Sequence, residues 1–319
     1  MNQTQTQSLS PARFLDRLSV WVNQAPVISW FLRRGYAQGA FWAVMIGVVS
    51  NTNDVLMCKL GNQFHTVEIT FFRYLFSMLT ILPFMLPYGT RFFKTKQLNM
   101  HWLRAIVGVV AVGLWCYSVQ VMPLAANTAI GFTMHLFVLL MAYLILKEKV
   151  DAPRWIAALV GFLGLMIIVQ PGTDAFRIEA MIPIAAAMSF ALLCIMAKKM
   201  ITDEHSYTLL FYFGLGTTAL AAIPLPFFWT TPGLVDLLYL AALGIGANLI
   251  QVCLFRAYAS ADASSLAPYM YVEMIISALS GYFFFKQIPS TFLYIGAILI
   301  ATSTFYITIV ETKRKGHAG

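Results

Sequence analysis

Apolar residues recur along the chain in ten stretches of about 20 residues, which is the length that a helix needs to cross a bilayer. Short joints with helix breakers separate the stretches, such as Gly61-Asn62, Pro171-Gly172 and Pro232-Gly233. The third and fourth stretches are divided only by the Met122-Pro123 turn. The pattern predicts an all-α integral membrane protein whose ten transmembrane helices span residues 37–58, 67–88, 102–121, 125–146, 153–170, 178–198, 206–228, 234–256, 263–285 and 290–310.

Composition excludes a soluble globular protein. Apolar residues make up 60% of the chain and charged residues 11%, and the mean hydropathy is +0.75. A soluble domain carries about 25% charged residues. The cysteines lie inside apolar stretches and show neither C-x-x-C spacing nor nearby histidine clusters, so we expect no disulfide, no metal site and no cofactor. They are Cys58, Cys116, Cys194 and Cys253.

Residues 1–36 precede the first stretch and begin with the polar, uncharged sequence MNQTQTQSLS, so we expect no signal peptide. Within this tail, residues 11–34 mix apolar side chains with Arg13 and Arg17. The segment reads equally well as an amphipathic helix on the membrane surface and as a disordered tail.

Basic residues predict the orientation, because Lys and Arg in short loops stay on the cytoplasmic side. With the N-terminus inside, 17 of the 21 Lys and Arg residues fall on the inner side, including the basic tail 311–319. Lys59, Arg177 and Lys286 fall outside, and Arg73 lies within a span. Both termini are therefore expected to be cytoplasmic. The net charge of +8 is this inner belt and requires no nucleic-acid partner.

The chain resembles itself when it is shifted by 139 residues without a gap. The shift carries each of the first five stretches onto one of the second five, which divides the chain into repeats at residues 37–170 and 178–310. Since five is odd, the repeats enter the membrane in opposite senses, an arrangement typical of secondary transporters. Identical pairs under this shift include Ser50 with Ser189, Lys59 with Lys198, Pro87 with Pro226 and Lys147 with Lys286.

Two segments carry a family resemblance. Residues 115–169, beginning WCYSVQVMPLAANTAIGF, and their shifted partner, ending in APYMYVEMIISALSGYFFFKQIPSTFLYIGAILIATS, resemble the two EamA-type repeats of the drug/metabolite transporter superfamily. The chain departs from that pattern at His135 and Met274, where the family commonly has proline, and at Gln287, where it has glutamate. Two further stretches, SNTNDVLMCKLGNQFHTVEITFFRYLFS and DASSLAPYMYVEMIISALSGYFFF, are similar to S-adenosylmethionine uptake carriers of obligate intracellular bacteria. The resemblance implies a multi-pass protein of a bacterial inner membrane.

Glu273 stands near the middle of an apolar run, where a carboxylate costs several kcal/mol unless it is paired, protonated or facing a cavity. On one continuous helix Tyr269 and Ser277 share its face, although helix packing explains the serine equally well. Asp54 and Asn51 lie one turn apart near the outer end of the first span, where Asp54 is either a site residue or an interfacial one. The eighth span adds a pair of amides, Asn248 and Gln251, that can bind a ligand or another helix.

Two further residues within the spans have more than one reading. Arg73 either snorkels or forms an ion pair with Asp54, and the ion pair is favoured. His135 is either a packed histidine or a proton-coupling residue that titrates between about pH 5 and 8.

Charge within the spans favours a particular substrate chemistry. Asp54 and Glu273 set against Arg73 leave one net negative charge, which suits a small molecule with a cationic centre. Tyr269 and Tyr271 add aromatic faces that attract a sulfonium or ammonium group. S-adenosylmethionine fits this description, and exchange for its demethylated product is one mode of its uptake. The alternatives are an exporter of amino acids, amines or other small metabolites, and a non-transporting membrane scaffold or receptor. No hydrolase, metalloprotease or Walker A motif occurs, so an enzyme is not expected.

Overall fold

The protein is all-helical throughout the residues that the computed structural model describes, which are 35–85, 95–147, 152–171, 177–200, 204, 206–260, 266 and 269–316. The tail segment 11–34 lies outside these ranges. In chain order the helices are α3 (Tyr36–Leu60), α4 (Thr66–Met85), α5 (Leu98–Val121), α6 (Leu124–Gly131), α7 (Met134–Leu146), α8 (Ala152–Val169), α9 (Met181–Met200), α10 (Ser206–Ala222), α11 (Leu234–Ser260), α13 (Val272–Phe285) and α14 (Thr291–Gly316), with 3-10 turns η2 (Ile178–Ala180) and η3 (Leu225–Phe227).

The helices have the length and composition of membrane spans. Among the described residues, six helical stretches are long and apolar enough to cross a membrane, and three shorter apolar helices accompany them. A helix satisfies its own backbone hydrogen bonds, which is what the hydrocarbon core requires. The all-α membrane class expected from the sequence is thereby confirmed. The six are Tyr36–Leu60, Leu98–Val121, Leu124–Leu146, Ile178–Met200, Thr208–Phe227 and Leu234–Ala257; the shorter ones are Trp155–Val169, Val272–Phe285 and Thr291–Tyr306.

Two of the expected spans are interrupted. Phe132 and Thr133 form a turn between α6 and α7, and the Thr133 hydroxyl donates to the Ile130 carbonyl at 2.5 Å. In the second half a turn at Tyr271 precedes α13. Phe132 and Tyr271 are 139 residues apart, so the breaks stand at equivalent places in the two halves.

Other backbone features recur at the same interval. Lys147 and Lys286 both end helices in the left-handed conformation, with φ of 54° and 56°. The next helices, α8 and α14, begin at Ala152 and Thr291. Each pair is separated by 139 residues, so the interval found in the sequence also relates helix ends.

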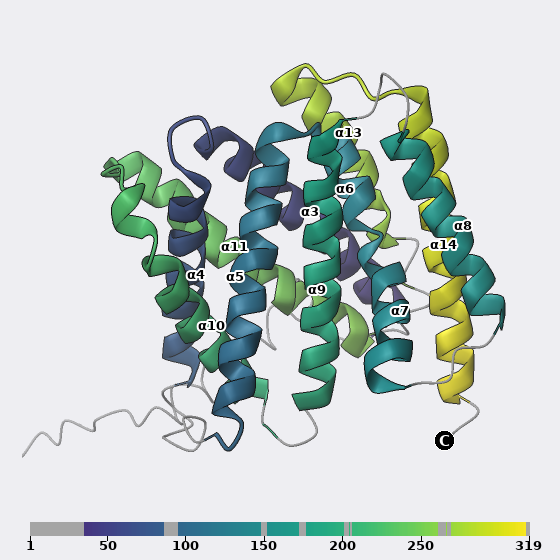
Figure 1. Ribbon diagram of the computed structural model, residues 1–319, viewed down its shortest axis with the longest axis horizontal. Coiled ribbons are helices and arrows are strands. Elements are labelled where there is room, and N and C mark those ends of the chain that lie inside the picture. Colours follow the sequence, from purple (N-terminus) through teal and green to yellow (C-terminus); the bar gives the residue numbers. More distant parts are fainter. Residues whose placement is uncertain are drawn as a thin grey trace, which may run out of the picture.

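The most extensive helix packing joins the two halves. Helix α3 packs on α11 and α5 packs on α9, which are the same interface with the halves exchanged. The pairs α4/α11 and α10/α5, and α13/α3 and α7/α9, correspond in the same way. Helices α8 and α14 lie side by side at one end of the bundle, and α4 and α10 pack together near the other end (Figure 1).

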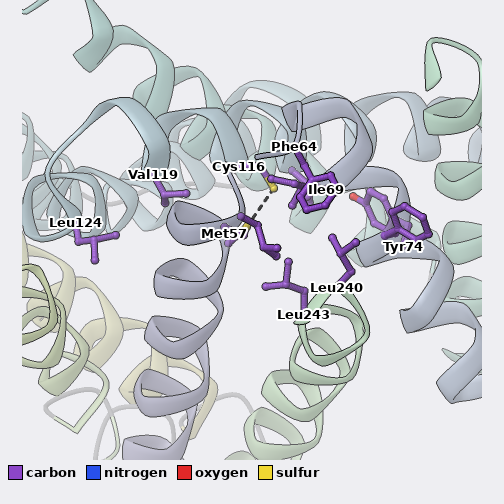
Figure 2. Packing of buried hydrophobic residues seen from close by; sticks show 12 residues of the cluster. Met57, Phe64, Ile69, Tyr74, Cys116, Val119, Leu124, Leu240 and Leu243 are labelled. Carbon is purple, nitrogen blue, oxygen red and sulfur yellow. Dashed lines mark hydrogen bonds between the residues drawn. The ribbon is translucent and has the colours of Figure 1, made fainter. Parts of the chain in front are cut away.

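A shared core fills the contact between the halves. Met57 of α3 lies between Cys116 of α5 and the α11 residues Leu240 and Leu243, and all four side chains are buried (Figure 2). The Cys116 thiol donates to the Met57 sulfur at 3.1 Å. The two halves therefore share one apolar core. The polar residues of α3 described next precede Met57 along that helix.

Candidate functional site

Glu273 lies in the first turn of α13, directly after the break at Tyr271, where the helix macrodipole favours a negative charge. A Cβ built on Gly47 of α3 would stand 2.9 Å from the Cβ of Glu273 and 3.1 Å from its Cα. Only glycine fits so close a contact. One turn further along α3, Ser50 hydrogen-bonds the Glu273 side chain. The break in the ninth span thus brings the carboxylate against the first span.

Two serines of α13 continue this contact on either side of the helix. The Ser280 hydroxyl donates to Asn51 Oδ1 on α3 at 2.5 Å. The Ser277 hydroxyl lies 2.8 Å from the hydroxyl of Thr128 on α6, and both residues are buried. Helix α13 is therefore held by polar contacts to α3 on one side and to α6 on the other.

Asp54 lies one turn beyond Asn51 and is only 2% exposed. Trp115 of α5 donates its indole N–H to Asp54 Oδ1 at 2.9 Å. The same indole reaches α6, since a Cβ on Gly131 would meet it at 2.7 Å, and it packs edge-on to Phe190 of α9 at 6.3 Å between ring centroids. Asp54 also interacts electrostatically with Glu273. Two carboxylates and an aromatic ring therefore meet where helices from both halves come together.

Several buried polar atoms of α3 and α6 have no hydrogen-bond partner among the described residues. They are Asn51 Nδ2, Asp54 Oδ2, and both the amide nitrogen and the amide oxygen of Asn127 on α6. Asn127 is fully buried. More than nine in ten buried polar groups in native proteins are satisfied by protein or water, so these atoms give α3 and α6 spare donor and acceptor capacity.

Arg73 of α4 approaches the same region from beyond Asp54. Its Nη1 donates to the Met57 sulfur at 3.4 Å, and it also hydrogen-bonds Cys116. It attracts Asp54 electrostatically, yet no nitrogen–oxygen contact of 4.0 Å or less joins the two among the described residues. The guanidinium is thus near the carboxylate without forming a direct ion pair with it.

Three other expected site residues lie elsewhere or make different contacts. Asn248 of α11 accepts a hydrogen bond from the Ser77 hydroxyl and donates one to the Ser77 carbonyl, both at 2.8 Å, so its amide joins α11 to α4. Gln251 is exposed. Tyr269 precedes the break and therefore does not continue the face of α13; its hydroxyl lies 3.1 Å from that of Tyr36.

His135 lies on α7 just after the break in the fourth span. Its Nδ1 is 3.1 Å from the Phe132 carbonyl oxygen, and its ring stacks on the Phe132 ring at 6.1 Å. Phe132 in turn lies 5.2 Å from the ring of Tyr271. These rings connect His135 to the turn that precedes Glu273. Among the described residues no group of three or more His, Cys, Asp and Glu side chains is placed to hold a metal ion.

Sequence reasoning did not identify Trp115, Thr128 or Ser50 as site residues. Trp115 stands in an apolar stretch, and its partner Asp54 is 61 residues away, so no local spacing signals the contact. For Ser50 the available signal was its place one turn from Gly47 and Asp54 on α3.

Comparisons with known proteins give a family match. A model of the EamA-like transporter family matches residues 37–170 and again residues 177–309. A relative named S-adenosylmethionine uptake transporter from Rickettsia prowazekii is 35% identical over 279 residues, which cover 87% of this chain and 95% of the relative. Its counterpart from Rickettsia bellii is 36% identical, covering 87% and 96%.

Other relatives carry different names. A protein named riboflavin transporter from Vibrio cholerae is 31% identical over 287 residues, covering 87% of this chain and 95% of the relative. A solved crystal structure superposes with a TM-score of 0.58 at 17% identity and covers 85% of this chain and 98% of that chain, which supports the fold alone.

Proposed function

Because the chain belongs to the EamA-like transporter family, we propose that it is a secondary transporter that takes up S-adenosylmethionine by alternating access. The relatives that bear that name match nearly their full length, which supports the substrate as well as the class. The observation that carries the proposal is the pair of buried carboxylates, Asp54 and Glu273, which lie within electrostatic range of one another between helices of both halves. Two neighbouring carboxylates disfavour each other's charge, and a cationic ligand relieves that repulsion.

We infer a ten-span architecture of two inverted repeats, at residues 37–170 and 178–310, with short cytoplasmic tails at residues 1–36 and 311–319. Support comes from the double family match and from helix contacts that correspond when the halves are exchanged. An odd number of spans in each half requires opposite orientations. The interrupted helices at Phe132 and Tyr271 resemble the discontinuous helices that line substrate sites in transporters of this kind.

Polar contacts between the halves stand at both ends of the bundle. At one end Glu204, before α10, accepts hydrogen bonds from Thr95 and pairs with His101 of α5 at 2.8 Å. At the other end Glu68 of α4 accepts from the backbone N–H of Thr230 at 3.2 Å. In alternating access the substrate path opens at one end of the bundle at a time. We therefore expect the contacts that join the halves at each end to break and re-form during transport.

Uptake of labelled S-adenosylmethionine by cells that express the protein tests the proposal directly. We expect saturable uptake that unlabelled S-adenosylmethionine inhibits, compared with cells that carry an empty vector. S-adenosylhomocysteine lacks the sulfonium charge but is the expected exchange partner, so preloading it inside vesicles should accelerate uptake. Uptake of labelled riboflavin instead, or efflux of amino acids or amines without S-adenosylmethionine uptake, contradicts the substrate assignment.

Topology is tested by cysteine labelling in intact cells. The loop around Asp174 to Glu179 is expected to react with an impermeant reagent added outside, whereas a cysteine at position 319 should react only after the cells are opened. Labelling of position 319 in intact cells would reverse the proposed orientation.

A further inference from the structure

Arg73 is a half-buried guanidinium whose hydrogen-bond acceptors in the described part of the chain are sulfur atoms, those of Met57 and Cys116. Sulfur is a weak acceptor, and a guanidinium carries five donors in a planar fork that matches a carboxylate. The nearest opposite charge, Asp54, attracts Arg73 without a contact of 4.0 Å or less. The strongest donor in this region is therefore incompletely satisfied.

Asp54 also has a hydrogen-bond acceptor that no described residue uses, and its negative charge complements the positive charge of Arg73. Its Oδ1 accepts the Trp115 indole N–H, but its buried Oδ2 has no partner. Met57, which Arg73 contacts, lies one turn from Asp54 on α3. A ligand that carries an anionic group and a cationic group on neighbouring atoms would satisfy Arg73 and Asp54 Oδ2 together.

Glu273 adds a third charge to those of Arg73 and Asp54, and the three charges follow one another along α3. Arg73 lies at the level of Met57, Asp54 comes one turn earlier, and Glu273 lies at the level of Gly47 and Ser50. At 1.5 Å per residue, Met57 and Gly47 are about 15 Å apart along the helix. One face of α3 is therefore lined in sequence by a positive charge, a negative charge and a second negative charge.

We propose that Arg73 binds the carboxylate of the substrate, and that the substrate class is an α-amino acid with a second cationic centre on its side chain. The carboxylate pairs with Arg73, the α-ammonium with Asp54, and the side-chain cation with Glu273. The inference rests on the proposed transport function and deepens it, since S-adenosylmethionine has this order of charges. A neutral substrate such as riboflavin has no carboxylate to pair with Arg73.

The test compares S-adenosylmethionine with decarboxylated S-adenosylmethionine, which keeps the amine and the sulfonium but lacks the carboxylate. Each compound competes with labelled S-adenosylmethionine for uptake by wild-type protein and by Arg73→Gln. Wild-type protein should prefer the carboxylate-bearing compound by about 10- to 100-fold. In Arg73→Gln the preference should fall to about one, because the affinity for S-adenosylmethionine drops while that for the decarboxylated compound does not.

Arg104→Gln is the matched control. Arg104 is also an arginine of the bundle, but it donates to the Leu209 carbonyl at 3.2 Å and lies over the Phe213 ring at 4.5 Å. Its loss should leave the preference at the wild-type value. If Arg73→Gln does not reach the membrane, Arg73→Lys decides, because it keeps the charge without the fork and should reduce the preference several-fold.

Each outcome has a separate meaning. A wild-type preference that persists in Arg73→Gln, or in Arg73→Lys where Gln is not expressed, overturns the carboxylate subsite and leaves the proposed transport function standing. Equal competition by both compounds in the wild type likewise overturns the subsite alone. Absence of S-adenosylmethionine uptake by the wild type overturns the proposed function and the subsite together.

Discussion

Two helix interfaces occupy equivalent places in the halves of this protein but differ in chemistry. The first, between α3 and α13, joins Asn51 to Ser280 and Ser50 to Glu273 by hydrogen bonds. The second, between α7 and α9, is an apolar cluster built on Phe137, Ala187 and Ala191. At the positions 139 residues from Glu273, Ser277 and Ser280, α7 has Met134, Val138 and Met141, and these pack against that cluster.

The facing helices differ in the same way. Where α3 has Gly47, Asn51 and Asp54, α9 has Ala186, Phe190 and Leu193. The apolar version shows that the scaffold packs without any of these polar groups, so the polar version is not needed to hold two helices together. The polar and charged side chains compared here lie in the α3–α13 interface, and we therefore expect the substrate site at that interface.

The contrast also bears on the kind of ligand that fits. Trp115 hydrogen-bonds Asp54 with its indole N–H and packs its ring against Phe190 of the apolar half. The region therefore has a charged side from α3 and α13 and an aromatic side from α5 and α9. An amphipathic substrate with a charged part and a planar part matches both sides.

Neutralising Glu273 removes the charge that most clearly distinguishes the α3–α13 interface from the apolar α7–α9 interface. Glu273→Gln keeps the shape but removes the charge, and a charged hydrogen-bonded contact contributes about 1.5–3 kcal/mol. Apparent affinity for the cationic substrate should fall by about one to two powers of ten in uptake titrations. Glu179→Gln is the control, because Glu179 is partly exposed and its 3.8 Å contact with Arg177 is on the surface.

Two results would change the assignment of Glu273. Normal affinity in Glu273→Gln removes it from the site. If the variant instead loses expression, the glutamate serves to hold α13 against α3 rather than to bind substrate.

Gly47→Ala makes α3 resemble α9 at the contact with α13. The added methyl would stand 2.9 Å from the Glu273 Cβ and close to its backbone, so the helices must separate. Overpacking costs about 1–3 kcal/mol, and the better helix propensity of alanine returns about 1. We expect uptake to fall about tenfold at normal abundance. Gly113→Ala is the control, since no atom lies within 4 Å of its added Cβ, and it should transport normally. Equal uptake by both variants argues against tight α3–α13 packing during transport.

Sequence reasoning predicted much of the helical scaffold because its signals are local. Apart from the two interrupted spans, apolar length, turn residues and the 139-residue interval predicted helices whose ends lie close to those of the structure, including the Met122-Pro123 joint between α5 and α6. It also singled out Asp54 and Glu273, because a charge in an apolar run is conspicuous. That the two carboxylates lie within electrostatic range of one another was not visible, since it depends on how helices from the two halves pack.

The turn at Tyr271 was missed for a different reason. Nothing in the run of residues 269–285 marks a break, because no glycine or proline stands at Tyr271. Helical spacing therefore placed Tyr269 on the face of Glu273, whereas the turn directs it to Tyr36. The equivalent turn at Phe132 does follow a glycine, Gly131, but a single glycine in an apolar run does not by itself predict a break.

Removing one hydrogen bond of the polar interface should have a smaller effect than removing its charge. Ser280→Ala deletes the donor to Asn51, and a neutral hydrogen bond contributes about 0.5–1.5 kcal/mol. We expect uptake affinity to fall about two- to tenfold, measured as for Glu273→Gln. Ser260→Ala is the control, because its hydroxyl donates only to the Arg256 carbonyl of its own helix. An unchanged affinity in Ser280→Ala would indicate that Asn51 finds another donor.

The smallest expected effect concerns the end of the bundle, where Glu204 joins the halves. Burial alone would raise the pKa of Glu204, but hydrogen bonds from Thr95 and His101 outweigh it and hold the pKa below its usual value. A carboxyl whose pKa is lowered on folding stabilises the folded state above its unfolded pKa of about 4.3, and loses that contribution as the pH falls through the lowered value. Glu204→Gln should therefore reduce thermal stability by about 1 kcal/mol from pH 7.5 down to about pH 5, measured on purified protein. The difference from the wild type should shrink as the pH falls below about 4 and close once the pH is below the lowered pKa, where the wild-type carboxyl is itself protonated. A gap that stays constant down to pH 3 would assign the contribution to packing of the side chain rather than to its charge.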